Sequence, residues 1–161
     1  MIRLPKAKGF TLIELLVVIA IISALAVTVF VALNPAKRLS DSRDARRTAD
    51  VDAILSAVHQ YIVDNKGSLP AGMSNSMAET QLGSGASGCA IATGGCAVTG
   101  LGCVNLSTPL ATYLKTIPVD PKGGTTYTSA KTGYSVGVDA NGIVTINACG
   151  TEGTTNIFSS R

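Results

Sequence analysis

The clearest pattern in the chain is an apolar run from Phe10 to Leu33, in which Glu14 is the only charged residue. The other polar side chains of this run are Thr11, Ser23 and Thr28. Twenty-four helical residues extend about 36 Å, enough to cross a hydrocarbon core of about 30 Å. The apolar pattern therefore predicts a membrane-spanning helix at residues 10–33. The carboxylate of Glu14 is energetically costly in such a helix unless it pairs with another group.

After Leu33 the pattern becomes amphipathic. Asn34-Pro35 predicts a kink or short interruption, because proline removes a backbone donor and disfavours helix at the preceding residue. Apolar residues then recur at steps of three and four, which is the spacing of one helix face. They are Val51, Ile54, Leu55, Val58, Tyr61 and Ile62. With Gly67 and Pro70 as stop signals, residues 34–67 predict an amphipathic second half of the helix.

The remaining residues, 68–161, predict a loop followed by a small antiparallel sheet. Residues 68–110 are rich in Gly, Ala, Ser and Thr, and strands are expected at Thr125–Ser129, Tyr134–Val138 and Ile143–Ala148. Asp139-Ala140-Asn141-Gly142 between the last two is a hairpin signal. Ile157 and Phe158 are expected to add an edge strand. The fold class is thus α+β, with a long N-terminal helix packed on a small sheet.

Four cysteines lie beyond the apolar run: Cys89, Cys96, Cys103 and Cys149. An even number of cysteines in an exported domain favours disulfides, and four cysteines allow three pairings. The six-residue gaps between the first three do not match the shorter spacing of zinc ligands. We expect two disulfides in the head formed by residues 68–161, with the pairing open.

The basic excess of the chain lies in its first nine residues, and the rest of the chain is balanced in charge. The formal net charge is +3, but Arg3, Lys6 and Lys8 precede the apolar run. Without these three, ten basic residues would balance ten acidic ones, so little repulsion would oppose the packing of many copies. No overall basic excess argues for nucleic-acid binding.

The run from Gly9 to Ile22 resembles the N-terminal signature of type IV prepilins and the related pseudopilins. In that family a short basic leader ends in glycine and is removed before an aromatic residue, whose amine is then methylated. The matching residues here are Gly9, Phe10 and Glu14, which implies a leader at residues 1–9 and methylation of Phe10. Many members carry a helix-breaking proline where this chain has Val31, which leaves the position of the kink open.

The resemblance implies a structural subunit of a type IV pilus filament. Its partners would be other copies of itself, the prepilin peptidase and N-methyltransferase, and an assembly platform protein with its ATPase. The precursor would be a single-pass protein of the cytoplasmic membrane with its N-terminus in the cytoplasm, and the filament would be extracellular or periplasmic. Glu14 is expected to accept the Phe10 amine of a neighbouring subunit.

The charged segment after the break also resembles one found in many pilins. Arg43, Arg46 and Arg47 are expected either to reach acidic groups on neighbouring subunits or to form a solvated helix face. Some pseudopilins bind calcium in the C-terminal region, where Asp120, Asp139 and Asn141 supply oxygen donors. Their spacing is not that of an EF-hand, and turn formation alone explains them. No other cofactor is expected.

Other classes of protein remain open. A pseudopilin of a type II secretion or competence system shares the same N-terminus. Ala24-Leu25-Ala26 fits an ordinary secretory cleavage site, although Glu14 and the continuing apolar run argue against a secreted disulfide-bonded domain. A membrane-anchored binding domain would keep residues 1–9. His59 lacks a placed catalytic partner, no catalytic motif occurs, and an enzyme is not expected.

Overall fold

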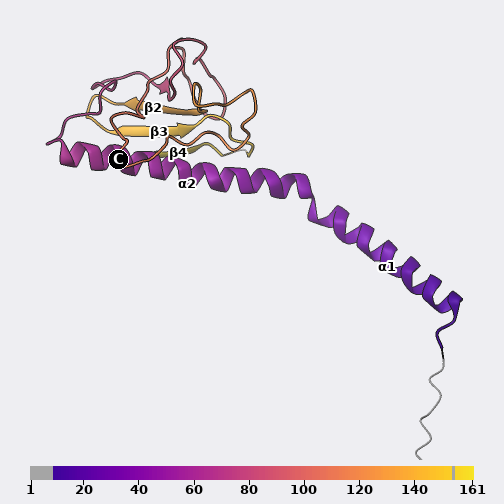
Figure 1. Cartoon of the computed structure of the whole chain (residues 1–161). Coiled ribbons are helices and arrows are strands. Elements are labelled where there is room, and N and C mark those ends of the chain that lie inside the picture. Colours follow the sequence, from indigo (N-terminus) through magenta and orange to yellow (C-terminus); the bar gives the residue numbers. More distant parts are fainter. Residues whose placement is uncertain (1–8, 154) are drawn as a thin grey trace, which may run out of the picture. The chain divides into compact units, whose positions relative to one another are not determined.

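The computed structural model (Figure 1) describes residues 9–153 and 155–161. Apart from Gly9, the predicted leader at residues 1–9 lies outside this part of the chain, as do Arg3, Lys6 and Lys8. The chain divides after Leu39 into two compact units.

Helix α1, Leu12–Leu33, forms the N-terminal unit together with the first turn of the next helix. None of its residues is buried. Its hydroxyl groups bond back to the helix backbone: Ser23 Oγ donates to the carbonyl of Ile19 at 2.7 Å, and Thr28 Oγ1 to that of Leu25 at 2.8 Å. The polar groups inside the run are thus satisfied locally, as a hydrocarbon environment requires.

The predicted break lies at Asn34-Pro35. Asn34 adopts a left-handed conformation with φ of 39°, and helix α2, Pro35–Asp64, begins at the next residue. Proline suits a first helical position because its missing N–H would have no partner there. At the other end, Lys66 has a φ of 55° and the amide of Gly67 donates to the carbonyl of Ile62 at 2.8 Å. This is a Schellman-type ending, with Lys66 and not Gly67 in the first left-handed position.

The C-terminal unit contains a four-stranded antiparallel sheet in the order β1-β2-β3-β4. Its strands are β1 (Thr80–Gln81), β2 (Tyr134–Val138), β3 (Val144–Ala148) and β4 (Ile157–Ser160). The β2–β3 hairpin and the β4 edge strand were predicted. Strand β1 was missed, because two residues inside a Gly- and Ser-rich loop carry no detectable alternation.

The sheet packs on helix α2, which lies along one side of it in Figure 1. The predicted face of α2 supplies Val51, Ile54, Leu55 and Val58 to this core, with Tyr61 and Ile62 partly buried at its edge. The sheet contributes the alternate residues of two strands: Tyr134, Val136, Val138, Val144, Ile146 and Ala148. The spacing of apolar residues in both elements thus predicts the core, since one helix stripe meets one sheet face.

The prediction of a strand at Thr125–Ser129 is wrong. These residues form turns that follow Gly123 and Gly124, which have φ of 51° and 72°. The amide of Tyr127 donates back to Gly123, and Thr128 and Lys131 bond to each other's backbone across a tight turn. Two consecutive left-handed glycines reverse the chain, so the β-favouring residues after them cannot extend into a strand.

Candidate processing and assembly segment

The start of helix α1 is a capping box formed by Thr11 and Glu14. The amide of Glu14 donates to Thr11 Oγ1 at 3.3 Å, while the amide and hydroxyl of Thr11 donate to Glu14 Oε2 at 2.8 and 2.6 Å. The carboxylate also lies in the first turn, where the helix dipole favours negative charge. Both contacts use Oε2, so Oε1 makes no hydrogen bond to any other residue that the structure describes.

Gly9 and Phe10 precede the helix and are both exposed, Phe10 by 80%. A side chain at Gly9 would meet no atom within 4 Å. A peptide bond between two exposed residues outside regular structure is accessible to a peptidase. Both residues that flank the predicted cleavage site are thus exposed and outside regular structure.

The surface of helix α1 is apolar all round. Phe10, Ile13, Glu14, Val17 and Val18 line a shallow hollow of about 400 Å³. Among the described residues this is also the one helical region long and apolar enough to cross a membrane, judged by length and composition. A helix that exposes apolar side chains on every face needs lipid or other helices around it.

Helix α2 carries a second polar arrangement, centred on Arg47. Its guanidinium is fully buried, and Nε and Nη2 donate to the two carboxylate oxygens of Asp120 at 2.7 and 2.8 Å. Nη1 donates to Asp44 at 2.7 Å, and Nη2 also lies 3.3 Å from Glu152 Oε1. This two-pronged contact satisfies a buried cation and a buried anion together.

Arg43 and the loop at Glu152 extend the network. Nε of Arg43 donates to Glu152 Oε1 at 2.7 Å, and Nη2 donates to Oε2. Asp44 in turn accepts from the backbone amides of Glu152 and Gly153 at 3.1 and 2.8 Å. Helix α2 thereby holds the segment that leads into strand β4.

The expectation for the three arginines is corrected in part. Arg47 is neither on a solvated face nor directed to another subunit, because its partners lie within this chain, and Arg43 pairs with Glu152. Arg46 alone fits the solvated alternative, since its side chain is 66% exposed and 3.8 Å from Asp50. Nothing in the helical spacing could have indicated Asp120, which lies 73 residues away.

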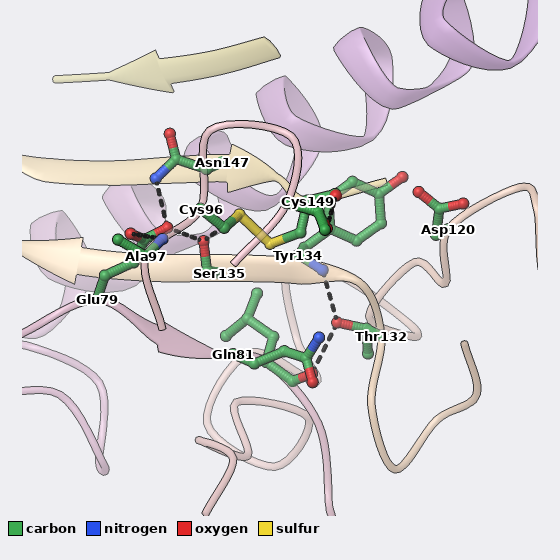
Figure 2. The surroundings of a disulfide bond; sticks show 12 residues. Glu79, Gln81, Cys96, Ala97, Asp120, Thr132, Tyr134, Ser135, Asn147 and Cys149 are labelled. Atoms are coloured by element: carbon green, nitrogen blue, oxygen red, sulfur yellow. Dashed lines mark hydrogen bonds between the residues drawn. A yellow bond between two sulfur atoms is a disulfide. The ribbon is translucent and has the colours of Figure 1, made fainter. Parts of the chain in front are cut away.

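The four cysteines form two disulfides, Cys89–Cys103 and Cys96–Cys149. Figure 2 shows the second bond beside the sheet face that does not contact α2. Ser135 is buried there and donates to Glu79, which also accepts from Asn147 Nδ2 at 3.0 Å and from the amide of Ala97 at 2.8 Å. The loop tied by Cys96 thus covers the second face of the sheet.

The candidate calcium ligands are engaged in other contacts. Asp120 is held by Arg47, whereas Asp139 Oδ1 accepts from the amides of Asn141 and Ile143, both at 2.8 Å. These bonds lower the pKa of Asp139, with the amide of Ile143 the larger cause. Among the described residues no cluster of three His, Cys, Asp or Glu suits a metal ion. The contacts seen are those of an ion pair and a β-turn.

Comparison with known families gives one match, the prokaryotic N-terminal methylation motif, over residues 4–30. Neither the curated proteins nor the solved structures contain a match. The motif and the fold together define a pilin-like α+β protein with a prepilin signature of the type IV pilin and pseudopilin kind. The signature is thus of the kind found in type IV pilin-like and pseudopilin precursors, and it points to a structural protein.

One feature of the segment was missed although the sequence carries its signal. Thr11-Leu12-Ile13-Glu14 has the threonine and glutamate spacing of a capping box directly before an apolar run. Glu14 therefore has a local structural role as well as the predicted one in assembly. Any test of assembly must separate the two roles.

Proposed function

We propose that this chain is the structural subunit of a type IV pilus filament, cut between Gly9 and Phe10 and methylated at the new amine. The observation that supports the proposal most directly is the position of Glu14. It is the single charge on a helix whose other exposed side chains are almost all apolar. Oε2 of Glu14 accepts the hydrogen bonds of the capping box, and Oε1 remains available as an acceptor.

Cleavage after Gly9 would create a cationic amine on Phe10. In a bundle of α1 helices, the free Oε1 of Glu14 accepts this amine from a neighbouring copy, so each contact neutralises two charges in an apolar setting. An unpaired carboxylate in the bundle is penalised, and the pairing therefore fixes the axial position of one helix against the next. Copies related by a rotation that does not close then form a helical filament.

The partners follow from this mechanism. A prepilin peptidase and N-methyltransferase would process residues 9 and 10, and a membrane platform with its ATPase would drive the addition of subunits. The precursor would be anchored in the cytoplasmic membrane by α1 with its N-terminus in the cytoplasm. The heads, held by two disulfides, would cover the filament outside the cytoplasm.

The first experiment is the intact mass and N-terminal sequence of the protein recovered from its native membrane and medium. We expect a chain that starts at methylated Phe10. A chain starting at Met1 would indicate a fixed anchor, and one starting at Val27 a secreted domain. Either result would overturn the assembly mechanism.

A pseudopilin of a type II secretion or competence system is the second candidate, because the methylation motif is common to both groups. Immunogold labelling of intact cells separates them. Long labelled filaments on the cell surface support the pilus subunit, whereas processed protein confined to the cell envelope supports the pseudopilin.

A further inference from the structure

A polar cleft in the C-terminal unit has no part in the assembly mechanism. It lies against the last turns of helix α2, encloses about 450 Å³, and is lined in part by Ser56, His59, Gln60 and Asp64 from the helix. Tyr113 and Arg161 line it from other parts of the unit. Its size is within the range of small-molecule sites, roughly 300–1,000 Å³.

The helical spacing explains why these side chains meet. His59 and Gln60 lie three and four residues after Ser56, so both are on the same side of α2 as Ser56, next to the apolar face that contacts the sheet. Tyr113 Oη donates to Asp64 Oδ2 at 2.8 Å, which fixes the tyrosine beside the end of the helix. Its ring also meets that of Tyr61 edge-on, with centroids 6.2 Å apart.

His59 provides the second observation. Its Nε2 is buried and makes no hydrogen bond, and among the described residues it is the only buried side-chain nitrogen or oxygen in that condition. Burying a ring nitrogen without a partner is unfavourable, and His59 also lines the cleft, so a hydrogen-bonding partner supplied there would stabilise it. This orphaned nitrogen points to a polar ligand.

The lining groups indicate the class of ligand. Ser56, Gln60 and Arg161 offer donors whose side chains bond to no other described residue, and Asp64 keeps Oδ1 as an acceptor. The Arg161 guanidinium suits a carboxylate, while the hydroxyl, amide and carboxylate groups suit the hydroxyls of a polyol. The Tyr113 ring adds an apolar surface of the kind that packs on sugar C–H groups.

We propose that this cleft binds a saccharide unit that carries a carboxylate, a hexuronate or a related acidic sugar. The carboxylate contacts Arg161, the ring hydroxyls contact Gln60, Ser56 and Asp64, and Nε2 of His59 gains its missing hydrogen bond. The proposal does not depend on cleavage at Gly9 or on assembly through Glu14.

The single histidine of the chain makes the test direct, because it gives one imidazole signal. The full chain in detergent micelles is titrated with D-glucuronate, D-glucose and acetate, and the ring resonances of His59 are followed by NMR. We expect saturable shifts with glucuronate and at least about tenfold weaker binding of glucose and of acetate. Arg161→Gln and Gln60→Ala should each weaken glucuronate binding by a similar factor.

Arg46→Gln is the matched control, since Arg46 is an exposed cation on the same helix but outside the cleft. It should bind glucuronate as the unchanged chain does. The absence of a saturable shift, equal binding by Arg161→Gln, or acetate binding as tight as that of glucuronate would overturn the proposal. The last outcome would identify a simple anion site and not a sugar site.

Discussion

Arg47 has an unusual position for an arginine, since its guanidinium is fully buried between helix α2 and Asp120. Burial of two opposite charges is costly, and it is tolerated here because both prongs of the guanidinium and both carboxylate oxygens are used. Removing one partner would leave the other charge buried without compensation. Such a change is more harmful than the loss of a surface ion pair.

Arg47→Met is therefore expected to lower the free energy of unfolding of the C-terminal unit by about 3–5 kcal/mol. Arg46→Met should lower it by at most about 1 kcal/mol, because the Arg46 side chain is 66% exposed and lies 3.8 Å from Asp50. Chemical denaturation of both variants in detergent, followed by circular dichroism, measures the difference. Equal losses would mean that the buried pair contributes no more than the exposed one.

Glu152 makes this region sensitive to acid. The hydrogen bond from Arg43, against the effect of burial and with help from Arg47, lowers the pKa of Glu152 from 4.5 to about 2. A carboxylate whose pKa is depressed in the folded state stabilises the fold at pH values above 4.5, and that contribution is lost as the pH falls from 4.5 toward 2.

Glu152→Gln should accordingly be less stable than the unchanged chain at pH 6, and the gap should narrow as the pH is lowered to about 3. Denaturation curves at several pH values test this expectation. Asp139→Asn is a useful comparison, because it removes a different carboxylate with a lowered pKa. A gap between Glu152→Gln and the unchanged chain that stays constant with pH would contradict the role given to Glu152.

At the scale of elements, the two disulfides differ in what they hold. Cys89 and Cys103 are separated by 14 residues and close a short loop, whereas Cys96 and Cys149 are separated by 53 and join the covering loop to the end of strand β3. In the chain-entropy model the longer loop is stabilised more, by about 4 against about 3 kcal/mol. The longer bond also keeps Ser135 and its partner Glu79 covered.

The double variant Cys96→Ala/Cys149→Ala should therefore lose more stability than Cys89→Ala/Cys103→Ala. It should also be cut faster by protease within residues 89–104, because the covering loop would lose its attachment to the sheet. Denaturation and limited proteolysis followed by mass spectrometry give both comparisons. A larger loss in the Cys89 and Cys103 variant would show that loop length and coverage do not govern stability here.

The elements differ in how far sequence alone predicts them. Helix α1 follows from the length of its continuous apolar run. Helix α2 and strands β2 and β3 follow from the spacing of apolar residues, because each places a regular set of positions in the core. Strand β1 could not be predicted, since two residues have no period and depend on pairing with β2. At Thr125–Ser129 residue preference gave the wrong answer because the preceding glycines impose turns.

The candidate site divides in the same way. Gly9, Phe10 and Glu14 lie close together in sequence, so their spacing alone suggests the predicted role. Arg47, Asp120 and Glu152 meet only through the tertiary fold, and no local pattern links them. The same holds for Tyr113 beside Asp64 in the α2 cleft.

At the scale of the whole molecule, the chain combines an apolar helix that needs neighbours with a head that is stable through its own contacts. The C-terminal unit has a core, two disulfides and a buried ion pair, so the proposed assembly would have little need to change it. In the proposed filament, the outcome of assembly would therefore depend mainly on the contacts of α1. Glu14 carries the single charge of that helix, so in the proposed filament it would be the residue that discriminates one arrangement from another.

Two substitutions separate the capping role of Glu14 from its proposed pairing role. Glu14→Gln keeps an acceptor that suits the third helical position of a capping box but removes the charge. Thr11→Val removes the hydroxyl of the cap but keeps the charge. If pairing with the Phe10 amine of a neighbour governs assembly, Glu14→Gln should reduce the yield of filaments at least about tenfold, while Thr11→Val should change it little.

Filament yield is measured by shearing and by electron microscopy, with immunoblots of membranes to establish that each precursor is present and processed. Equal loss in both variants would attribute the role of Glu14 to the helix start and not to pairing. Normal yield from Glu14→Gln would show that its charge is dispensable. A loss of filament yield in Glu14→Gln alone, with the precursor still cleaved, would support the pairing. The physical reason would be an unpaired Phe10 amine in the apolar bundle, because the substitution removes its counter-charge.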